Sequence, residues 1–181
     1  MKFTSSLLVL TLVGVCAHVS AQEPAPVSLC AANEEPIFSC TLQGPSRKVV
    51  SLCASTPSSP QGKRRFHYLY GRPSKIELRY PSNDDGDEAF TFTHLHFSGA
   101  TAGYAYAFTN MGFKYIMYWI SGTGFERSGL LVQREGQLRA DRDMHCKPSA
   151  PTATKSHELW DATSKWKVDP DIDAHNLPST H

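Results

Sequence analysis

Four cysteines beyond the N-terminal segment constrain the fold of this chain more than any other feature: Cys30, Cys40, Cys53 and Cys146. An even number of thiols in an exported chain predicts two disulfides. The alternative is a metal site, but the gaps of 10, 13 and 93 residues lack the close pairs of zinc sites. The sequence leaves the three pairings of four cysteines open. Any bond to Cys146 would close a loop around most of the domain.

The N-terminus has the parts of an export signal. Lys2 precedes an apolar run over residues 7–15, and small residues at 19–21 suit cleavage after Ala21. A membrane anchor is disfavoured because the run is about half of the ~20 residues that cross a bilayer. A lipoprotein at Cys16 is disfavoured because Val15 is larger than the residue that normally precedes a lipidated cysteine. We therefore expect a periplasmic or secreted protein.

Composition divides the chain into four parts. Residues 1–21 are the signal peptide, 22–29 an extended leader, 30–146 a β-rich domain and 147–181 a polar tail with one short helical pattern. Lys and Arg number 18 against 17 Asp and Glu, so no basic field favours nucleic acid. No later apolar run is long enough to span a membrane. The oligomeric state is not indicated.

The domain has the period-two pattern of β-strands. Residues 38–42 and 48–53 flank the turn signal Gly44-Pro45-Ser46, which predicts a hairpin. Further strands are expected at residues 66–70, 75–80, 89–98, 103–109, 113–121 and 128–134. The fold class is therefore all-β: an antiparallel meander of about eight or nine strands, forming a small barrel, a sandwich or a two-sheet roll. In the tail, only residues 156–166 have a helical pattern.

Aromatic residues are concentrated in three of the expected strands. Phe90 and Phe92 share one face, and Tyr104, Tyr106 and Phe108 share a face of the next strand. This pattern favours a hydrophobic core. The alternative is that some of these rings form an exposed platform for sugar or a partner protein, and Tyr104 and Trp119 are the rings that would bind sugar.

Metal and catalytic patterns are weak. His94 and His96 point the same way on one strand, but a metal site needs a third ligand, so we expect no metal and no cofactor. The acidic run at residues 83–88 lacks the twelve-residue spacing of a calcium loop. Serine-hydrolase, zincin, P-loop and dinucleotide motifs are absent, and no pair of carboxylates stands out as acid and base. The sequence thus favours binding over catalysis.

Two loops of small residues are the candidate partner-binding elements. Ser98 and Gly99 begin one, which runs toward Tyr104, and Ser121 and Gly122 begin the other. Such loops can enter a partner's cleft because their side chains have little bulk. The alternative is that they are ordinary turns between strands.

Parts of the domain resemble known groups. The segments Phe38-Ser39-Cys40, Lys48 to Cys53 and Tyr70 to Leu78 resemble a group of small exported proteins of Gram-negative bacteria. The resemblance covers residues 30–146 and implies a compartment and a β-rich architecture. Ser98-Gly99 with Tyr104 is similar to a loop of periplasmic lysozyme inhibitors, which implies insertion of that loop into an enzyme's cleft.

These observations predict a non-enzymatic periplasmic or secreted binding protein with a protein partner. Its most concrete form is an inhibitor or immunity protein that acts on a cell-wall-degrading enzyme. The alternative is a carbohydrate- or envelope-binding module that uses exposed aromatic rings.

Overall fold

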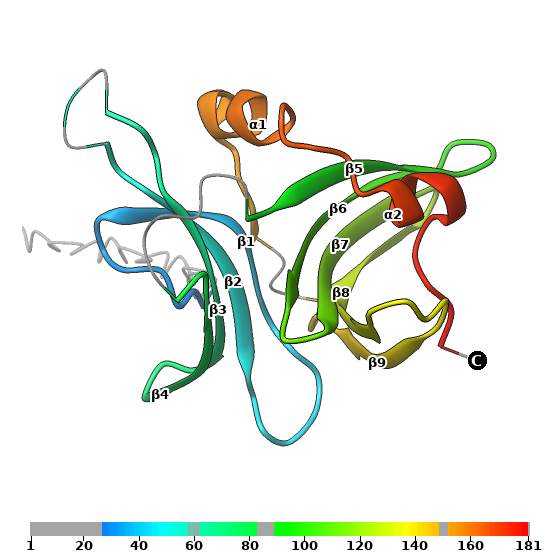
Figure 1. The fold of residues 1–181 in the computed structure, drawn as a ribbon, viewed down its shortest axis with the longest axis horizontal. Helices are drawn as coiled ribbons and strands as arrows, with labels where there is room; N and C mark the ends of the chain where they lie inside the picture. The colour runs from blue at the N-terminus through cyan, green and yellow to red at the C-terminus, as the bar shows by residue number, and fades with distance from the viewer. Residues whose placement is uncertain (1–26, 58, 60–61, 83–88, 149–151, 181) are drawn as a thin grey trace, which may run out of the picture.

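Two five-stranded antiparallel sheets make up the fold, which is that of a computed structural model (Figure 1). The structure describes residues 27–57, 59, 62–82, 89–148 and 152–180, so the expected signal peptide, leader residues 22–26 and acidic run 83–88 lie outside the described residues. The first sheet contains β1 (Glu34–Thr41), β2 (Val49–Ser55), β3 (Phe66–Arg72), β4 (Lys75–Tyr80) and β10 (Thr152–Ala153). The second contains β5 (Thr91–His96), β6 (Ala102–Asn110), β7 (Phe113–Gly122), β8 (Phe125–Arg134) and β9 (Ala140–His145).

Strands β1–β4 and β5–β9 are each an antiparallel meander, and β10 returns to pair with β1, so the predicted all-β class is confirmed. The orders are β10-β1-β2-β3-β4 and β5-β6-β7-β8-β9. Strands β9 and β10 were not predicted from the sequence. The segment over β9, Ala-Asp-Arg-Asp-Met-His, has too few apolar residues to show alternation. It becomes a strand because it pairs with β8, from Gly129 with His145 to Gln133 with Ala140.

A corner of the molecule joins the two sheets. Beyond β9 the chain continues along the free edge of β1, where Leu42 and Cys146 form a bridge and the Lys147 amide donates to the Thr41 carbonyl over 2.9 Å. Farther on, β10 pairs with β1 at Phe38 and Ser39. The Cys40–Cys146 disulfide lies at this corner and has a sequence separation of 106. One long crosslink therefore ties the last strand of the second sheet to the first sheet.

The second disulfide, Cys30–Cys53, attaches the end of the leader to the outer face of the first sheet. Beneath the leader, the fully buried Ser39 and Ser51 hydroxyls lie 2.7 Å apart. The Ser39 hydroxyl donates to the Val27 carbonyl, and the Leu29 amide donates to Ser51. The structure thus settles the pairing of the four cysteines and shows that residues 27–29 lie against Ser39 and Ser51.

Aromatic rings fill the space between the sheets. Tyr80 of β4 stacks on Phe108 of β6 with a centroid distance of 4.4 Å, and Phe108 stacks on Tyr115 of β7 at 4.9 Å. The expectation of a hydrophobic core is confirmed for these strands. Tyr104 is 7% exposed and stacks on the partly buried Trp119 at 5.5 Å. These two rings are therefore part of the core and do not form an exposed platform.

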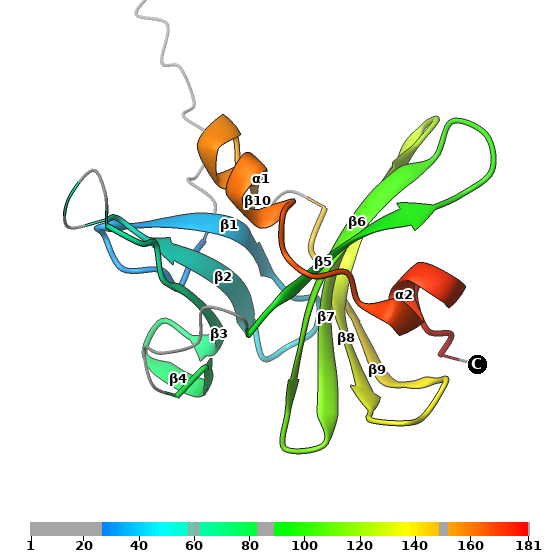
Figure 2. The same ribbon diagram turned by 45° about the horizontal axis from the view of Figure 1, so that its top comes forward.

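The polar tail packs back onto both sheets. Helix α1 (His157–Thr163), capped by Ser156, lies over the junction between the sheets (Figure 2). Trp160 contacts Phe92 of the second sheet at 5.4 Å, while Trp166 contacts both Phe66 of the first sheet and Phe90. The tail thus completes the core that residues 30–146 leave open on this side.

A second tail helix, α2 (Pro170–His175), covers the opposite face of the second sheet. Its Ile172 is 2% exposed and packs in a separate apolar cluster with Ala105, Ile116 and Leu131. At six residues, α2 is too short for a periodic pattern, and its sequence signal is Asp169 as N-cap followed by Pro170. Neither described helix has the length and apolar character that a membrane crossing requires.

The two disulfides should differ in their contribution to stability. Chain entropy predicts that a crosslink with a separation of 106 stabilises by about 1 kcal/mol more than one of 23. We expect the double variant Cys40→Ala/Cys146→Ala to lose more free energy of unfolding than Cys30→Ala/Cys53→Ala. Urea unfolding followed by tryptophan fluorescence measures both. An equal or reversed loss would contradict a chain-entropy origin.

Two buried tyrosines provide a matched test of the core. The Tyr68 hydroxyl is buried and has no hydrogen-bond partner in the described part of the chain, whereas Tyr106 shares a 3.2 Å hydrogen bond with Thr163 of α1. Burial raises the pKa of both phenols, that of Tyr106 to about 12. Because an unpaired buried hydroxyl costs about 1–3 kcal/mol, we expect Tyr68→Phe to be neutral or stabilising in thermal unfolding. Tyr106→Phe should destabilise by about 1 kcal/mol, and equal losses would be evidence against this difference.

Candidate functional site

Two loops of small residues lie side by side at one end of the second sheet (Figures 1 and 2). One joins β5 to β6 and the other joins β7 to β8. They are adjacent because β6 and β7 are paired up to Ala102 and Ser121, directly beside both loops. We call residues 97–101 and 121–125 together the loop end. Sequence reasoning named both loops without indicating that they meet.

Two aromatic side chains are exposed on the loop end. Phe97 is 38% exposed and Phe125 is 50% exposed, although most rings of this protein lie in the core. Phe125 packs on Gly122, where an added Cβ would lie 2.4 Å from the ring and 2.8 Å from the Thr101 hydroxyl oxygen. Gly122 therefore allows the two loops to approach each other closely. Sequence reasoning missed both phenylalanines because each falls at a strand boundary, where alternation does not predict exposure.

The structure separates the predicted partner-binding residues into two groups. Ser98 and Gly99 are exposed at the tip of the first loop, and Ser121 and Gly122 are half-buried beside it. Tyr104, the fifth predicted residue, does not lie on the binding surface. Its ring lies in the core, where it contacts Trp160 of the tail at a centroid distance of 5.3 Å. Burial raises the pKa of its phenol, with Tyr106 and Glu126 adding to the effect. Four of the five residues thus remain available to a partner.

The two histidines considered as metal ligands are both exposed on β5. His96 Nε2 lies 3.7 Å from Asp173 of α2, and the His94 ring contacts Phe92. Within the described residues, the grouping with metal-ligand geometry is instead Glu34, Cys53 and His67. Cys53 is bonded to Cys30, so that set has no free thiolate to offer.

The tail holds the edge strand that leads into the loop end. Asn176 pairs with the backbone of His96 through both polar atoms of its side-chain amide: Nδ2 donates to the His96 carbonyl, and Oδ1 accepts from the His96 amide. The Phe92 amide donates to the Lys167 carbonyl, and the Asp169 amide donates to Thr93. These bonds satisfy edge groups of β5 that would otherwise be open to another strand.

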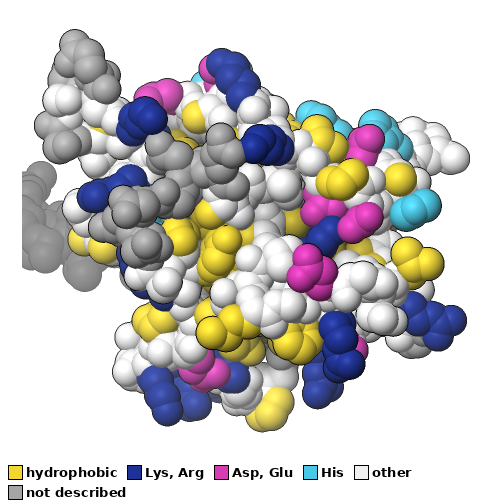
Figure 3. Space-filling view, viewed as in Figure 1, with side chains coloured by type: hydrophobic (Ala, Val, Ile, Leu, Met, Phe, Trp, Pro, Cys, Tyr) yellow, Lys and Arg dark blue, Asp and Glu magenta, His cyan; other side chains and the backbone are white. Residues whose placement is uncertain are grey.

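A partly buried lysine, Lys114, anchors α2 to the sheet. The Lys114 ammonium donates to Asp169 at 2.9 Å and to Asp171 at 2.7 Å, and only 11% of its side chain is exposed. Desolvation lowers the pKa of Lys114, but the hydrogen bonds to both carboxylates outweigh it and the net shift is upward. Figure 3 shows acidic and histidine side chains gathered over α2 and the neighbouring sheet.

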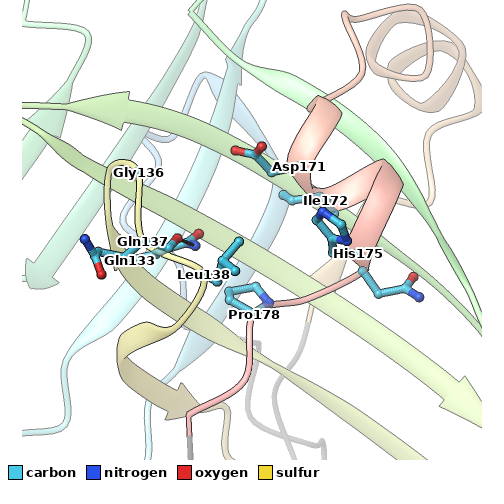
Figure 4. A pocket seen from close by; sticks show the side chains of 9 residues that line it. Gln133, Gly136, Gln137, Leu138, Asp171, Ile172, His175 and Pro178 are labelled. Carbon is cyan, nitrogen blue, oxygen red and sulfur yellow. Dashed lines mark hydrogen bonds between the residues drawn. The ribbon is translucent and has the colours of Figure 1, made fainter.

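A small cavity separates α2 from the β8–β9 turn (Figure 4). Its volume is about 110 Å³, and its walls include Asp171, Ile172 and His175 of α2 and, opposite them, Leu138 and Pro178. The side-chain amide of Gln133 donates to the Gln137 carbonyl on the turn side. Ligand pockets usually measure roughly 300–1,000 Å³, so this space is a packing seam between the tail and the sheet.

Comparison of the chain with family models, with curated proteins and with solved structures found no match. The resemblances described above therefore stay predictions. The loop end is therefore the candidate functional site, on its geometry alone.

The Lys114 anchor gives a pH-dependent prediction. The hydrogen bond from Lys114 lowers the pKa of Asp171 below its ordinary 3.8. The stability that this ion pair contributes is therefore complete above pH 3.8, and it is lost as the pH falls through the lowered pKa of Asp171 in the folded protein. Because the pKa of Lys114 is raised above its ordinary 10.5, the same ion pair is lost at alkaline pH only above pH 10.5. The methyl resonance of Ile172, followed by NMR, reports whether α2 is packed on the sheet. We expect its chemical shift to be constant between these two pH limits and, on acidification, to move toward the value of an exposed isoleucine.

Removing the ammonium should loosen α2 at neutral pH as well. We expect Lys114→Gln to lower the free energy of unfolding by about 2 kcal/mol at pH 7 and to remove the acid transition of Ile172. Lys165→Gln is the control, because its bond to Asp161 joins two side chains that are 71% and 67% exposed. Equal effects of the two variants would mean that Lys114 is not the anchor.

Proposed function

We propose that this chain is a non-enzymatic exported binding protein whose loop end engages a protein partner. The best candidate partner is a cell-wall-degrading enzyme, which the protein would inhibit. The observation that carries the proposal is the side-by-side placement of two small-residue loops with Phe97 and Phe125 exposed on them.

The shape of the loop end suits a concave partner. Ser98-Gly99 and Thr123-Gly124 present little side-chain bulk at the tips, so backbone can enter a cleft that larger side chains would not fit. Gly99 and Gly124 have φ values of 74° and 78°, which glycine adopts without strain. The exposed phenylalanines beside the tips provide apolar contact area of the kind that dominates interface energetics.

The loop end is also held in place before any partner binds. The β6–β7 ladder fixes the spacing of its two loops, and Asn176 of the tail fixes His96 at the start of the first loop. A preorganised loop loses less conformational entropy on binding than a flexible one does. This restraint supports a rigid insertion element rather than an adaptable surface.

Inhibition assays with purified enzymes test the proposal. A lysozyme, a lytic transglycosylase and an amidase would be assayed by the clearing of a peptidoglycan suspension, with and without the disulfide-bonded protein. We expect inhibition of at least one enzyme. Ser98→Arg and Thr123→Arg should weaken it about tenfold or more, since each places a bulky charge at a tip.

Ser46→Arg is the matched control, because Ser46 is an exposed serine in the β1–β2 turn of the first sheet and is not part of the loop end. It should leave inhibition unchanged. The inhibitor proposal fails if no enzyme of the panel is bound or inhibited. Sedimentation with bare peptidoglycan that is lost in Phe97→Ala/Phe125→Ala would instead support an envelope-binding module.

A further inference from the structure

A groove lies at the corner where β8 and β9 meet the end of β1, outside the loop end. Its volume is about 560 Å³, and its polar lining includes Gln43, Glu126, Arg127, Ser128, His145 and Lys147. Hydrogen bonds and a disulfide hold its walls. The Gln43 backbone amide donates to the His145 carbonyl, its side-chain Nε2 donates to the Cys146 carbonyl, and Cys146 is bonded to Cys40. The groove is therefore a built feature of the corner.

A hydrogen-bonded network orients the imidazole of the groove. The hydroxyl of Tyr118, a residue only 1% exposed, donates to Asp143 Oδ1 over 3.1 Å and lies 3.1 Å from His145 Nδ1. Since a phenol has one proton to donate, the Tyr118 oxygen accepts from His145 Nδ1. Burial, with Asp143 adding, raises the pKa of Tyr118, so the phenol stays protonated.

A glycine makes this network possible. Tyr118 on β7 reaches across β8 to Asp143 and His145 on β9 where β8 has Gly129. A Cβ at this position would lie 2.9 Å from the Tyr118 hydroxyl oxygen and 2.6 Å from the Met144 carbonyl oxygen. Residues of three neighbouring strands, β7, β8 and β9, therefore fix the position of the His145 imidazole.

Two cations of the groove, Arg127 and Lys147, have no carboxylate partner among the residues that the structure describes. The Arg127 guanidinium lies 5.9 Å from the Tyr118 ring centroid, and neither Arg127 nor Lys147 makes an ion pair within the part of the chain that the structure describes. Asp143 is already engaged by Tyr118 and His145. Glu126 also lines the groove and is exposed, and its negative charge offsets part of the positive charge of Arg127 and Lys147.

We propose that this groove binds an oxyanion, a carboxylate or a phosphate, through Arg127 and Lys147, with His145 and Gln43 as neighbouring polar groups. A guanidinium presents planar paired donors that match both anions, and an ammonium adds a point charge. The site is independent of the proposed function, although Arg127 lies two residues from Phe125, so a partner at the loop end could place an acidic group there.

Binding of small anions tests the site without knowledge of the natural ligand. The ¹⁵N-labelled protein with both disulfides formed would be titrated with sodium phosphate and with sodium acetate, against sodium chloride at equal ionic strength. We expect saturable shifts of the Ser128, His145 and Lys147 amide resonances with phosphate, acetate or both, and none with chloride. Phosphate alone would assign a phosphate-bearing ligand, and acetate alone a carboxylate.

Variants with matched changes of charge separate a site from a general field. Arg127→Gln and Lys147→Gln should each weaken binding about tenfold, and Glu126→Gln should strengthen it. Arg142→Gln is the control, because Arg142 is exposed on β9 and does not line the groove. The proposal is overturned if neither anion gives saturable shifts, or if Arg142→Gln weakens binding as much as Arg127→Gln.

Discussion

Burial of aromatic rings between the two sheets is the interaction on which the rest of the structure depends. Each sheet alone would expose one face of large rings, since Tyr68 and Tyr80 lie on the first sheet and Phe92, Tyr106 and Phe108 on the second. Offset and edge-to-face pairs contribute about 0.5–1.5 kcal/mol each beyond the area that they bury. The Cys40–Cys146 bond and the continuous edge of β1 keep the two faces in contact at one corner.

The tail is part of this core. Trp160 and Trp166 close the side that the strands leave open, and Ile172 covers the other face of the second sheet. Because Lys114 and Asn176 fix α2 against that sheet, the loop end has a supporting layer behind it. The described tail residues thus connect core packing with the geometry of the proposed binding surface.

Strand β8 links the two surfaces to which we assign binding. Its first residue, Phe125, belongs to the loop end, while Arg127 lines the groove, so an apolar surface passes into a cationic one along a single strand. Interfaces commonly combine an apolar centre with a polar and charged rim. A partner that covers both surfaces would match this arrangement.

The sequence by itself determined the all-β class, the hairpin before Val49, most strand positions and the disulfide-bonded state, because strand periodicity and cysteine count are local properties. It could not determine the cysteine pairing, the strand at Ala140–His145 or the docking of α2, because these depend on contacts between distant segments. The candidate loops were found as small-residue runs. Only the tertiary structure showed that the two loops meet, that Tyr104 lies in the core and that Phe97 and Phe125 are exposed. The sequence could not show this because the exposure of a side chain depends on which neighbouring strands and helices cover it.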